Sequence, residues 1–153
     1  MTLSRLIRQT ALMGAGVLLG GSRYSPAVEI SADTVGDLEL AWEYSTGDME
    51  ARPEAVAKSA SEGTPILANG RLTYCTPFNE IIALDPGTGA ELWQYDPGIA
   101  TDYEPANQYL CRGVVHWEDP QAEAGAACAA RIFMGTADSR VISVDAATGQ
   151  PCA

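Results

Sequence analysis

The sequence predicts an all-β fold and, within that class, a partial β-propeller that contains about two four-stranded antiparallel blades. Three observations support this prediction: one phrase occurs twice at an offset of 60 positions, short β-branched runs alternate with turns, and a Trp follows the turn phrase of the first copy. Fifteen Gly and nine Pro among 153 residues favour such a turn-rich chain. A small sheet repeated along one chain is typical of propeller blades.

The two copies each predict a β-hairpin. RLTYCTPFNEIIALDPGTG, from Arg71, aligns without a gap with RIFMGTADSRVISVDAATG, from Arg131. In both, two short apolar and β-branched runs flank a tight turn, which is the pattern of a hairpin. Thr76 and Thr136 occupy matching repeat positions in the strands, so we interpret neither as a nucleophile.

The Asp-x-x-Thr-Gly phrase at the end of each copy predicts a second turn. The Asp and Thr side chains can bond local backbone N–H groups, and the Gly can take positive φ. We therefore interpret Asp85 and Asp145 as turn caps, not as paired catalytic carboxylates.

Further strands extend this pattern in both directions. A third run, 91–95, carries Trp93, and Trp42 in LELAWEYSTGD matches it, while EGTPILANG offers a short strand before Arg71. A Trp at the outer end of a blade would dock against the turn of the next blade and bury a large ring. The alternative fold is a small β-sandwich with ordinary core Trp residues, but sandwiches do not usually repeat one turn phrase.

These elements suggest boundaries along the chain. Blade one covers about 60–96, an insertion covers 97–130, and an incomplete second blade covers 131–153. Within the insertion, DPQAEAGAACAA is rich in Ala and acidic residues, and we expect an exposed loop. The position that matches Trp93 in the second copy is Ala153, the last residue, so we expect this chain to be the N-terminal part of a longer protein.

Residues 1–21 have a different character from residues 22–153. MTLSRLIRQT carries Arg5 and Arg8, and ALMGAGVLLGG follows it without a charge. A basic start and a short apolar run are typical of a secretory signal peptide, and the run is shorter than the roughly 20 residues that span a bilayer. An amphipathic or disordered N-terminal extension is the alternative interpretation.

Charge and cysteine content exclude some functions. Nine basic and 20 acidic residues give a net charge of −11, which disfavours a nucleic-acid partner. The four cysteines, which agree with an oxidising compartment, lack the C-x-x-C spacing that is common in zinc sites. Cys128 and Cys152 flank one hairpin and are the disulfide we expect first, with buried free thiols as the alternative.

Four phrases, taken in order, resemble the membrane-bound PQQ (pyrroloquinoline quinone) dehydrogenases of the glucose/quinate/shikimate type. They span about 21–152: GSRYSPAVEISADTVGDLELAWEYSTGD, EGTPILANGRLTYCTPFNEIIALDPGTGAELWQYDP, CRGVVHWED and CAARIFMGTADSRVISVDAATGQPC. The resemblance implies a parent propeller of eight blades with PQQ on its axis beside Ca²⁺. It also implies oxidation of a sugar or cyclic polyol, transfer of electrons to ubiquinone, and a periplasmic location with or without attachment to the inner membrane.

The resemblance assigns two cofactor-binding residues. Glu62, in the family's E-x-T-P position, would contact PQQ, and Arg112, in C-R-G, would bind PQQ carboxylates or a quinone oxygen through two parallel donors. Gly113 would let the backbone approach a planar ligand. A solvated loop carboxylate and a surface ion pair are the alternatives for Glu62 and Arg112.

No catalytic or metal-binding residue is assigned in this chain. The resemblance places the family's Asp base and its calcium ligands beyond residue 153, so we expect the chain alone to be inactive. His116 is the only histidine, and it stands where the family usually has an aromatic residue; we expect a hydrogen-bonded structural role. Trp117 stands near another position at which relatives carry a ring.

A second functional class also uses such repeats. A non-enzymatic propeller could serve as a protein-binding scaffold in the cell envelope. Such scaffolds lack the C-R-G and E-x-T-P phrases, so the dehydrogenase is the leading hypothesis.

Overall fold

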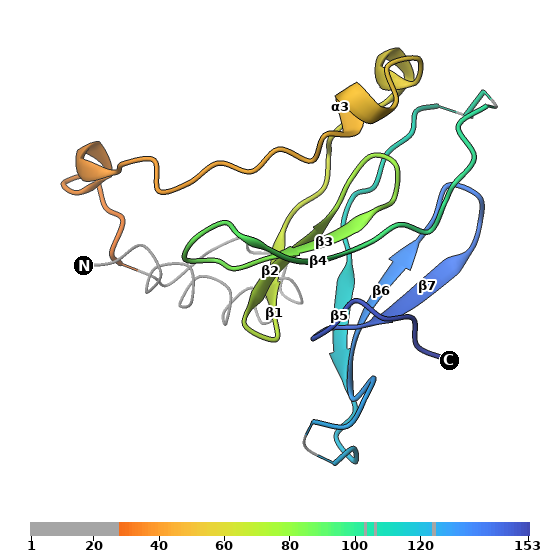
Figure 1. Ribbon diagram of the computed structural model, residues 1–153. Helices are drawn as coiled ribbons and strands as arrows, with labels where there is room; N and C mark the ends of the chain where they lie inside the picture. Colours follow the sequence, from red (N-terminus) through yellow and green to blue (C-terminus); the bar gives the residue numbers. More distant parts are fainter. Residues whose placement is uncertain (1–27, 103, 106, 124) are drawn as a thin grey trace.

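The chain forms two antiparallel sheets that are joined by one long connection, between β4 and β5 (Figure 1). The computed structural model describes residues 28–153 apart from 103, 106 and 124, so the signal-like segment 1–21 lies outside the described residues. The first sheet has the order β1-β2-β3-β4 and the second the order β5-β6-β7. The strands are β1 (Ile66–Ala68), β2 (Arg71–Cys75), β3 (Ile81–Leu84), β4 (Glu91–Tyr95), β5 (Val115–Glu118), β6 (Ala130–Gly135) and β7 (Val141–Asp145).

Helical structure is confined to short turns in the described part of the chain. These are η1 (Val35–Asp37), α3 (Asp48–Ala51) and η2 (Val56–Lys58), all before the first strand. None of the described helices has the length and apolar character needed to cross a membrane. The all-β prediction is therefore confirmed.

The two predicted hairpins have the same register. Leu72 pairs with Leu84 in β2–β3, and Ile132 pairs with Val144 in β6–β7, which preserves the 60-residue offset on both strands. The hairpin turns also match, because Asn79 and Ser139 both have positive φ, at 63° and 66°. The sequence repeat is thus a structural repeat.

The second sheet begins earlier than the sequence analysis proposed. β5 lies inside the segment 97–130 that was interpreted as an insertion, and it pairs with β6 as β1 pairs with β2. A two-residue turn, Asn69–Gly70, joins β1 to β2, whereas residues 119–129 join β5 to β6. This longer connection moves β5 out of the ungapped alignment and hides it. The connection itself is largely exposed, as we expected for DPQAEAGAACAA.

The two sheets share one hydrophobic core. Ile81 and Ala83 of β3 contribute to it from the first sheet, and Ile132, Met134 and Val144 contribute from the second. All five side chains are buried. Burial of both inner faces removes apolar surface from water and holds the sheets together.

The predicted Trp docking is present twice. The ring of Trp93 lies against Gly149 in the second sheet, where a Cβ on that glycine would be 2.6 Å from Trp93 Cε3. The ring of Trp42 lies against Gly89 in the first sheet in the same way, and Trp42 Nε1 donates to Pro86 O at 3.3 Å. Both glycines have φ of 73°, a conformation that favours glycine.

Trp42 docks without belonging to a strand. Residues 38–47 form an extended segment, which precedes α3 in Figure 1 and has no strand pairing among the described residues. The interpretation of LELAWEYSTGD as a strand is therefore wrong for this chain by itself. A strand needs a hydrogen-bonded neighbour, and the described residues provide none, although the side-chain part of the prediction is correct.

Candidate functional site

Each sheet has two ends with different contents. We call the end that carries the hairpin turns 76–80 and 136–140 the site end, and the end that carries the turns 85–89 and 145–149 the Trp-docking end. Antiparallel strands bring the loop before the first strand of each sheet to the same end as the hairpin turn. The residues before β1 and β5 therefore lie at the site end.

The two residues predicted to bind a cofactor lie together at the site end. Arg112 Nε is 3.4 Å from Glu62 Oε2, although 50 positions separate them in the sequence. Their side chains are 75% and 46% exposed. An exposed pair of this kind contributes about 0–1 kcal/mol to stability, so both groups can change partners at little cost.

Backbone hydrogen bonds hold the two loops in parallel. The Tyr109 N–H donates to Lys58 O at 2.7 Å, and the Ala60 N–H donates to Tyr109 O at 3.0 Å. Farther along, the Thr64 N–H donates to Arg112 O at 3.4 Å. These bonds place the loop that carries Glu62 beside the loop that carries Arg112.

A disulfide that the sequence analysis did not pair joins the same region. Cys75, the last residue of β2, is bonded to Cys111, the neighbour of Arg112, with 5.9 Å between their Cα atoms. Both cysteines are buried. Gly63, the neighbour of Glu62, packs against this bridge so closely that a Cβ would be 2.7 Å from Cys75 O and 3.4 Å from Cys111 O.

Asn79 supports the loop that leads into Arg112. Its buried side chain donates from Nδ2 to Leu110 O at 3.3 Å, and its Oδ1 accepts from the Ala137 N–H at 2.7 Å. One side chain thereby ties both hairpin turns to the loop that leads into Arg112. Next to it, the ring of Phe78 packs on Tyr109, with 5.7 Å between centroids.

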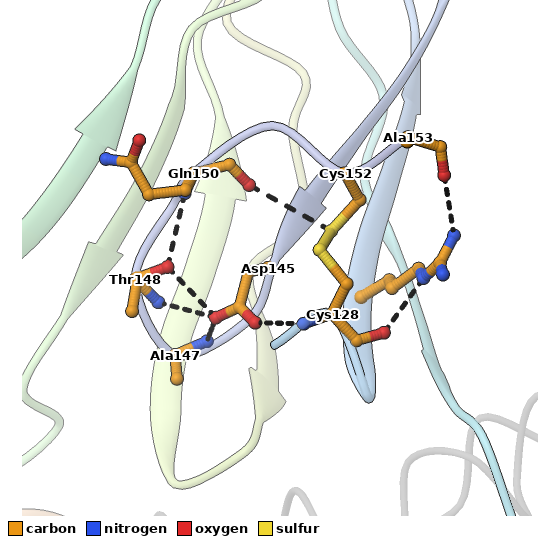
Figure 2. The surroundings of a disulfide bond; sticks show 8 residues. Cys128, Asp145, Ala147, Thr148, Gln150, Cys152 and Ala153 are labelled. Atoms are coloured by element: carbon orange, nitrogen blue, oxygen red, sulfur yellow. Dashed lines mark hydrogen bonds between the residues drawn. A yellow bond between two sulfur atoms is a disulfide. The ribbon is translucent and has the colours of Figure 1, made fainter. Parts of the chain in front are cut away.

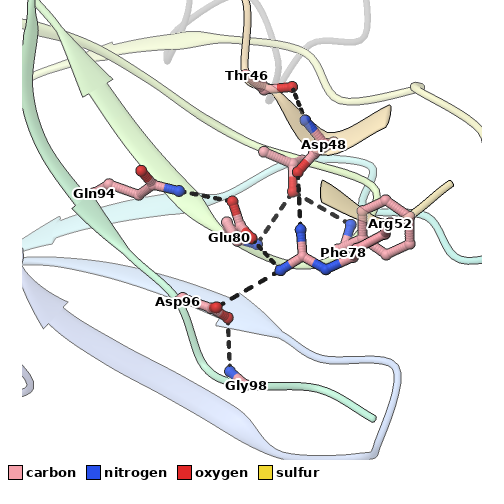
Figure 3. Close-up of polar contacts among 9 residues, drawn as sticks. Thr46, Asp48, Arg52, Phe78, Glu80, Gln94, Asp96 and Gly98 are labelled. Carbon is pink, nitrogen blue, oxygen red and sulfur yellow. Dashed lines mark hydrogen bonds and ion pairs between the residues drawn. The ribbon is translucent and has the colours of Figure 1, made fainter. Parts of the chain in front are cut away.

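A charged network fixes the N-terminal segment to the site end (Figure 3). Arg52 forms ion pairs with Asp48 at 3.2 Å, with Glu80, and with Asp96 at 3.6 Å, and its guanidinium lies 4.8 Å from the centre of the Phe78 ring. Burial raises the pKa of Asp48, against the lowering effects of hydrogen bonding from Thr46 and of the Arg52 charge. The network therefore places three carboxyl groups around one guanidinium, and two of them, those of Asp48 and Glu80, are buried.

The Trp-docking end holds the predicted disulfide. Cys128 and Cys152 are bonded, and Figure 2 shows Asp145 beside them. Asp145 Oδ2 accepts from the Cys128 N–H at 2.6 Å, while Oδ1 accepts from the Ala147 and Thr148 N–H groups at 2.9 Å each. Although burial of Asp145 opposes its ionisation, these hydrogen bonds lower its pKa below the usual range.

The turn-cap interpretation of the repeated Asp residues is confirmed. Asp85 Oδ1 accepts from the Gly87 and Thr88 N–H groups at 2.9 and 2.8 Å, as Asp145 does in its own turn. Thr76 and Thr136 follow their strands directly, and each hydroxyl accepts a backbone N–H from four residues on. All four side chains therefore bond to backbone groups of their turns. The Asp positions agree with the turn-cap prediction, whereas Thr76 and Thr136, which the repeat places in strands, lie one residue beyond β2 and β6.

His116 has a different environment from the one we expected. It lies on β5 with its side chain 23% exposed, and Nε2 is 3.6 Å from Glu118 Oε1. That nitrogen is buried and has no hydrogen-bond partner among the described residues, so the expectation of a hydrogen-bonded His is wrong for Nε2. Trp117, which is partly exposed, lies next to the guanidinium of Arg131.

Sequence reasoning missed three contributors to the site. They are Gly63, the Cys75–Cys111 bridge and Asn79, none of which carries out chemistry. One signal was available, since Cys111 adjoins Arg112 and Cys75 is matched by Gly135 in the second copy. Across the described residues, no group of three or more His, Cys, Asp or Glu side chains could hold a metal ion.

Comparison with known proteins gives a consistent result. Residues 16–153 match the family model of the glucose/ethanol/alcohol dehydrogenase β-propeller domain. The chain is 41% identical over 132 residues to the glycerol dehydrogenase large subunit of Gluconobacter oxydans, and 36% identical over 136 residues to the quinoprotein glucose dehydrogenase of Escherichia coli. These alignments cover 85% and 86% of this chain but only 17% of each relative.

A solved structure gives the same match. The quinohemoprotein alcohol dehydrogenase from Comamonas testosteroni aligns with a TM-score of 0.68 at 28% identity. The alignment covers 98% of this chain and 20% of that protein. The fold is therefore that of a partial propeller, and the alternative prediction of a small sandwich is wrong. The chain spans about a fifth of the length of the proteins it matches.

Proposed function

The chain belongs to the PQQ-dependent glucose/ethanol/alcohol dehydrogenase β-propeller family, and on that premise we propose that it is the N-terminal part of a quinoprotein dehydrogenase. The substrate class we propose is a sugar or cyclic polyol, since similar proteins include glucose, glycerol and quinate/shikimate dehydrogenases. The contribution of this segment is to bind PQQ through Glu62 and Arg112.

The Glu62–Arg112 pair carries this proposal. PQQ bears carboxylates, and a guanidinium can bind a carboxylate with two parallel N–H donors. The Arg112 side chain is 75% exposed, so its donors are available to a ligand. Glu62 supplies a carboxylate acceptor within reach of the same ligand, for example for a ring N–H.

The chain leaves open space at Gly113, the residue that follows Arg112. A Cβ on Gly113 would meet no atom of the described residues within 4 Å, so the chain leaves room beside Arg112. The donor set and this space fit PQQ. When bound, PQQ supplies the two-electron oxidation of a carbon that bears a hydroxyl, and the protein binds and orients it.

The rest of the machinery is proposed to lie outside this chain. We assign the general base and the Ca²⁺ ligands to other parts of the parent protein, with ubiquinone as the electron acceptor. We place the parent in the periplasm, either free or attached to the inner membrane. On this proposal the 153-residue chain alone does not turn over substrate, even with PQQ and Ca²⁺.

The test compares PQQ binding and dye reduction by the full-length protein that contains this chain. Arg112→Gln and Glu62→Gln are each expected to weaken PQQ binding at least about tenfold, because each removes a charged hydrogen-bonding partner. Lys58→Gln is the matched control, since it breaks another exposed ion pair, with Glu104. Glucose, glycerol and quinate serve as the substrate panel.

Two results would contradict the proposal. One is a parent protein that neither binds PQQ nor reduces dye with any polyol, which would favour the protein-binding scaffold. The other is equal PQQ affinity in the Arg112→Gln, Glu62→Gln and Lys58→Gln variants. Turnover by the isolated chain would contradict only its proposed inactivity.

A further inference from the structure

We propose that the Cys75–Cys111 disulfide is a positioning device that holds Arg112 and Glu62 in the geometry for ligand binding. The proposed role of this disulfide is therefore more specific than general stabilisation of the fold. This inference rests on the proposed role of the pair in binding PQQ. It concerns residues of the described chain alone.

Three segments meet at this disulfide. Cys75 ends β2, Cys111 immediately precedes Arg112, and Gly63 immediately follows Glu62. Gly63 lies against the backbone of both cysteines, at a distance that excludes a Cβ. The bridge therefore connects a rigid strand of the first sheet to both site loops, one by a covalent bond and the other by close packing.

The hairpin itself does not require this bridge. The second hairpin, β6–β7, keeps the same register with Gly135 at the position of Cys75. The two turns also share their backbone bonds, from the Thr76 N–H to Glu80 O and from the Thr136 N–H to Arg140 O, both at 2.9 Å. We therefore infer that Cys75 serves to hold the loop that contains Cys111 and Arg112.

Arg112 depends on this tether for its position. Its side chain is largely exposed, and its carbonyl accepts a long bond of 3.4 Å from the Thr64 N–H. The disulfide fixes the preceding residue at a Cα–Cα distance of 5.9 Å from the end of β2. Without it, the guanidinium would sample more positions, and ordering it would oppose ligand binding.

The second disulfide provides a matched control. Cys128–Cys152 lies at the Trp-docking end, where its neighbours are Asp145 and Arg131. It closes a loop of 24 residues, against 36 for Cys75–Cys111, so their removal should loosen the unfolded chain to similar extents. Only the first adjoins Glu62 and Arg112.

The experiment measures the PQQ dissociation constant of the full-length protein by fluorescence, well below its unfolding temperature. Cys75→Ser/Cys111→Ser is expected to weaken binding about tenfold, a typical coupling between residues in contact. Cys128→Ser/Cys152→Ser should leave affinity within about twofold of the parent. Substitution is used because a thiol reductant would react with the quinone.

A double-mutant cycle separates positioning from general damage. In an Arg112→Gln background, removal of Cys75 and Cys111 should weaken PQQ binding by about threefold or less, because Glu62 is the only one of the two positioned groups that remains. A merely structural role would give the same tenfold loss in both backgrounds. Additive losses would therefore overturn the inference.

The remaining outcomes are also decisive. If the unsubstituted protein binds PQQ and both disulfide variants weaken binding equally, the positioning role is wrong and the proposed function stands. If the unsubstituted protein does not bind PQQ, the proposed function fails first, and this inference fails with it. If Cys75→Ser/Cys111→Ser does not fold, Gly63→Ala replaces it, since it keeps both disulfides and displaces the Glu62 loop. Unchanged PQQ affinity in Gly63→Ala would then contradict the proposal.

Discussion

The two copies of the repeat, 71–89 and 131–149, agree at one end of their sheets and differ at the other. At the Trp-docking end, the Gly89 N–H donates to Asp85 O and the Gly149 N–H to Asp145 O, both at 2.8 Å. At the site end, the first copy has a buried Phe78 and Glu80, whereas the second has an exposed Asp138 and Arg140 at the same positions.

The difference separates a structural role, shared by both copies, from a role at the candidate site that only the first copy has. Each Trp-docking turn receives the ring of a preceding segment, so the same contacts are needed in both copies. The site-end turns have different neighbours, because the first copy supports the Arg112 loop through Asn79 and Phe78. Repetition within this chain therefore marks structure, and departure from it marks the candidate site.

The largest expected effect compares the two docked rings. Trp93→Ala should lower the free energy of unfolding by about 3–5 kcal/mol, since Trp93 is 9% exposed and belongs to the core between the sheets. Trp42→Ala should cost about 1–2 kcal/mol, because that ring is only half-buried. Urea unfolding followed by circular dichroism measures both. Equal losses would show that the core between the sheets adds little to ring docking.

The glycines under the rings should show a smaller effect. Gly149→Ala and Gly89→Ala each place a Cβ at φ of 73° and within 2.6 Å of a Trp ring atom. Strain and displacement of the ring should together cost about 2 kcal/mol. Gly70→Ala is the control, with the same φ and no atom of the described residues within 4 Å of its Cβ. If all three variants lose the same stability, ring contact contributes nothing beyond backbone strain.

A still smaller effect should depend on pH at the Trp-docking end. The folded-state pKa of Asp145 is below its usual range, so ionised Asp145 stabilises the folded protein above about pH 4, and this contribution is lost as pH falls through the folded pKa. Asp145→Asn should cost about 1–2 kcal/mol at pH 7 and less at acidic pH. Unfolding measured across pH 3–7 would contradict this if the cost were constant.

The smallest effect should have the opposite sign at the site end. Burial raises the folded-state pKa of Asp48, so its ionisation removes stability as pH rises from its unfolded pKa through the folded one. Asp48→Asn should therefore gain stability relative to the parent over that interval, by about 1 kcal/mol or less because the Arg52 ion pair is lost as well. The same pH series measures it. A parallel trend for the Asp48 and Asp145 variants would contradict the contrast between the two ends.

Local pattern was sufficient for the first sheet and for the β6–β7 hairpin of the second. Apolar runs, tight turns and the Asp-x-x-Thr-Gly phrase predicted both hairpins, the turn caps and the docking of Trp93, because these depend on residues close in sequence or on a repeated unit. The pattern failed for β5, because the long connection 119–129 between β5 and β6 interrupts the alignment of the two copies. It also failed for residues 38–47, which resemble a strand in sequence but have no strand partner among the described residues.

The sequence by itself determined the repeat and the turn chemistry, since these follow from residue types at fixed spacings, and its resemblance to a known family indicated Glu62 and Arg112 as candidate ligand-binding residues. Only the tertiary structure decided that Glu62 and Arg112 meet, that Cys75 pairs with Cys111, and that Gly63 leaves room for their bridge. The physical reason is that these contacts join loops brought together by the packing of two sheets. The number of residues between two positions in the sequence does not show whether such loops meet in space.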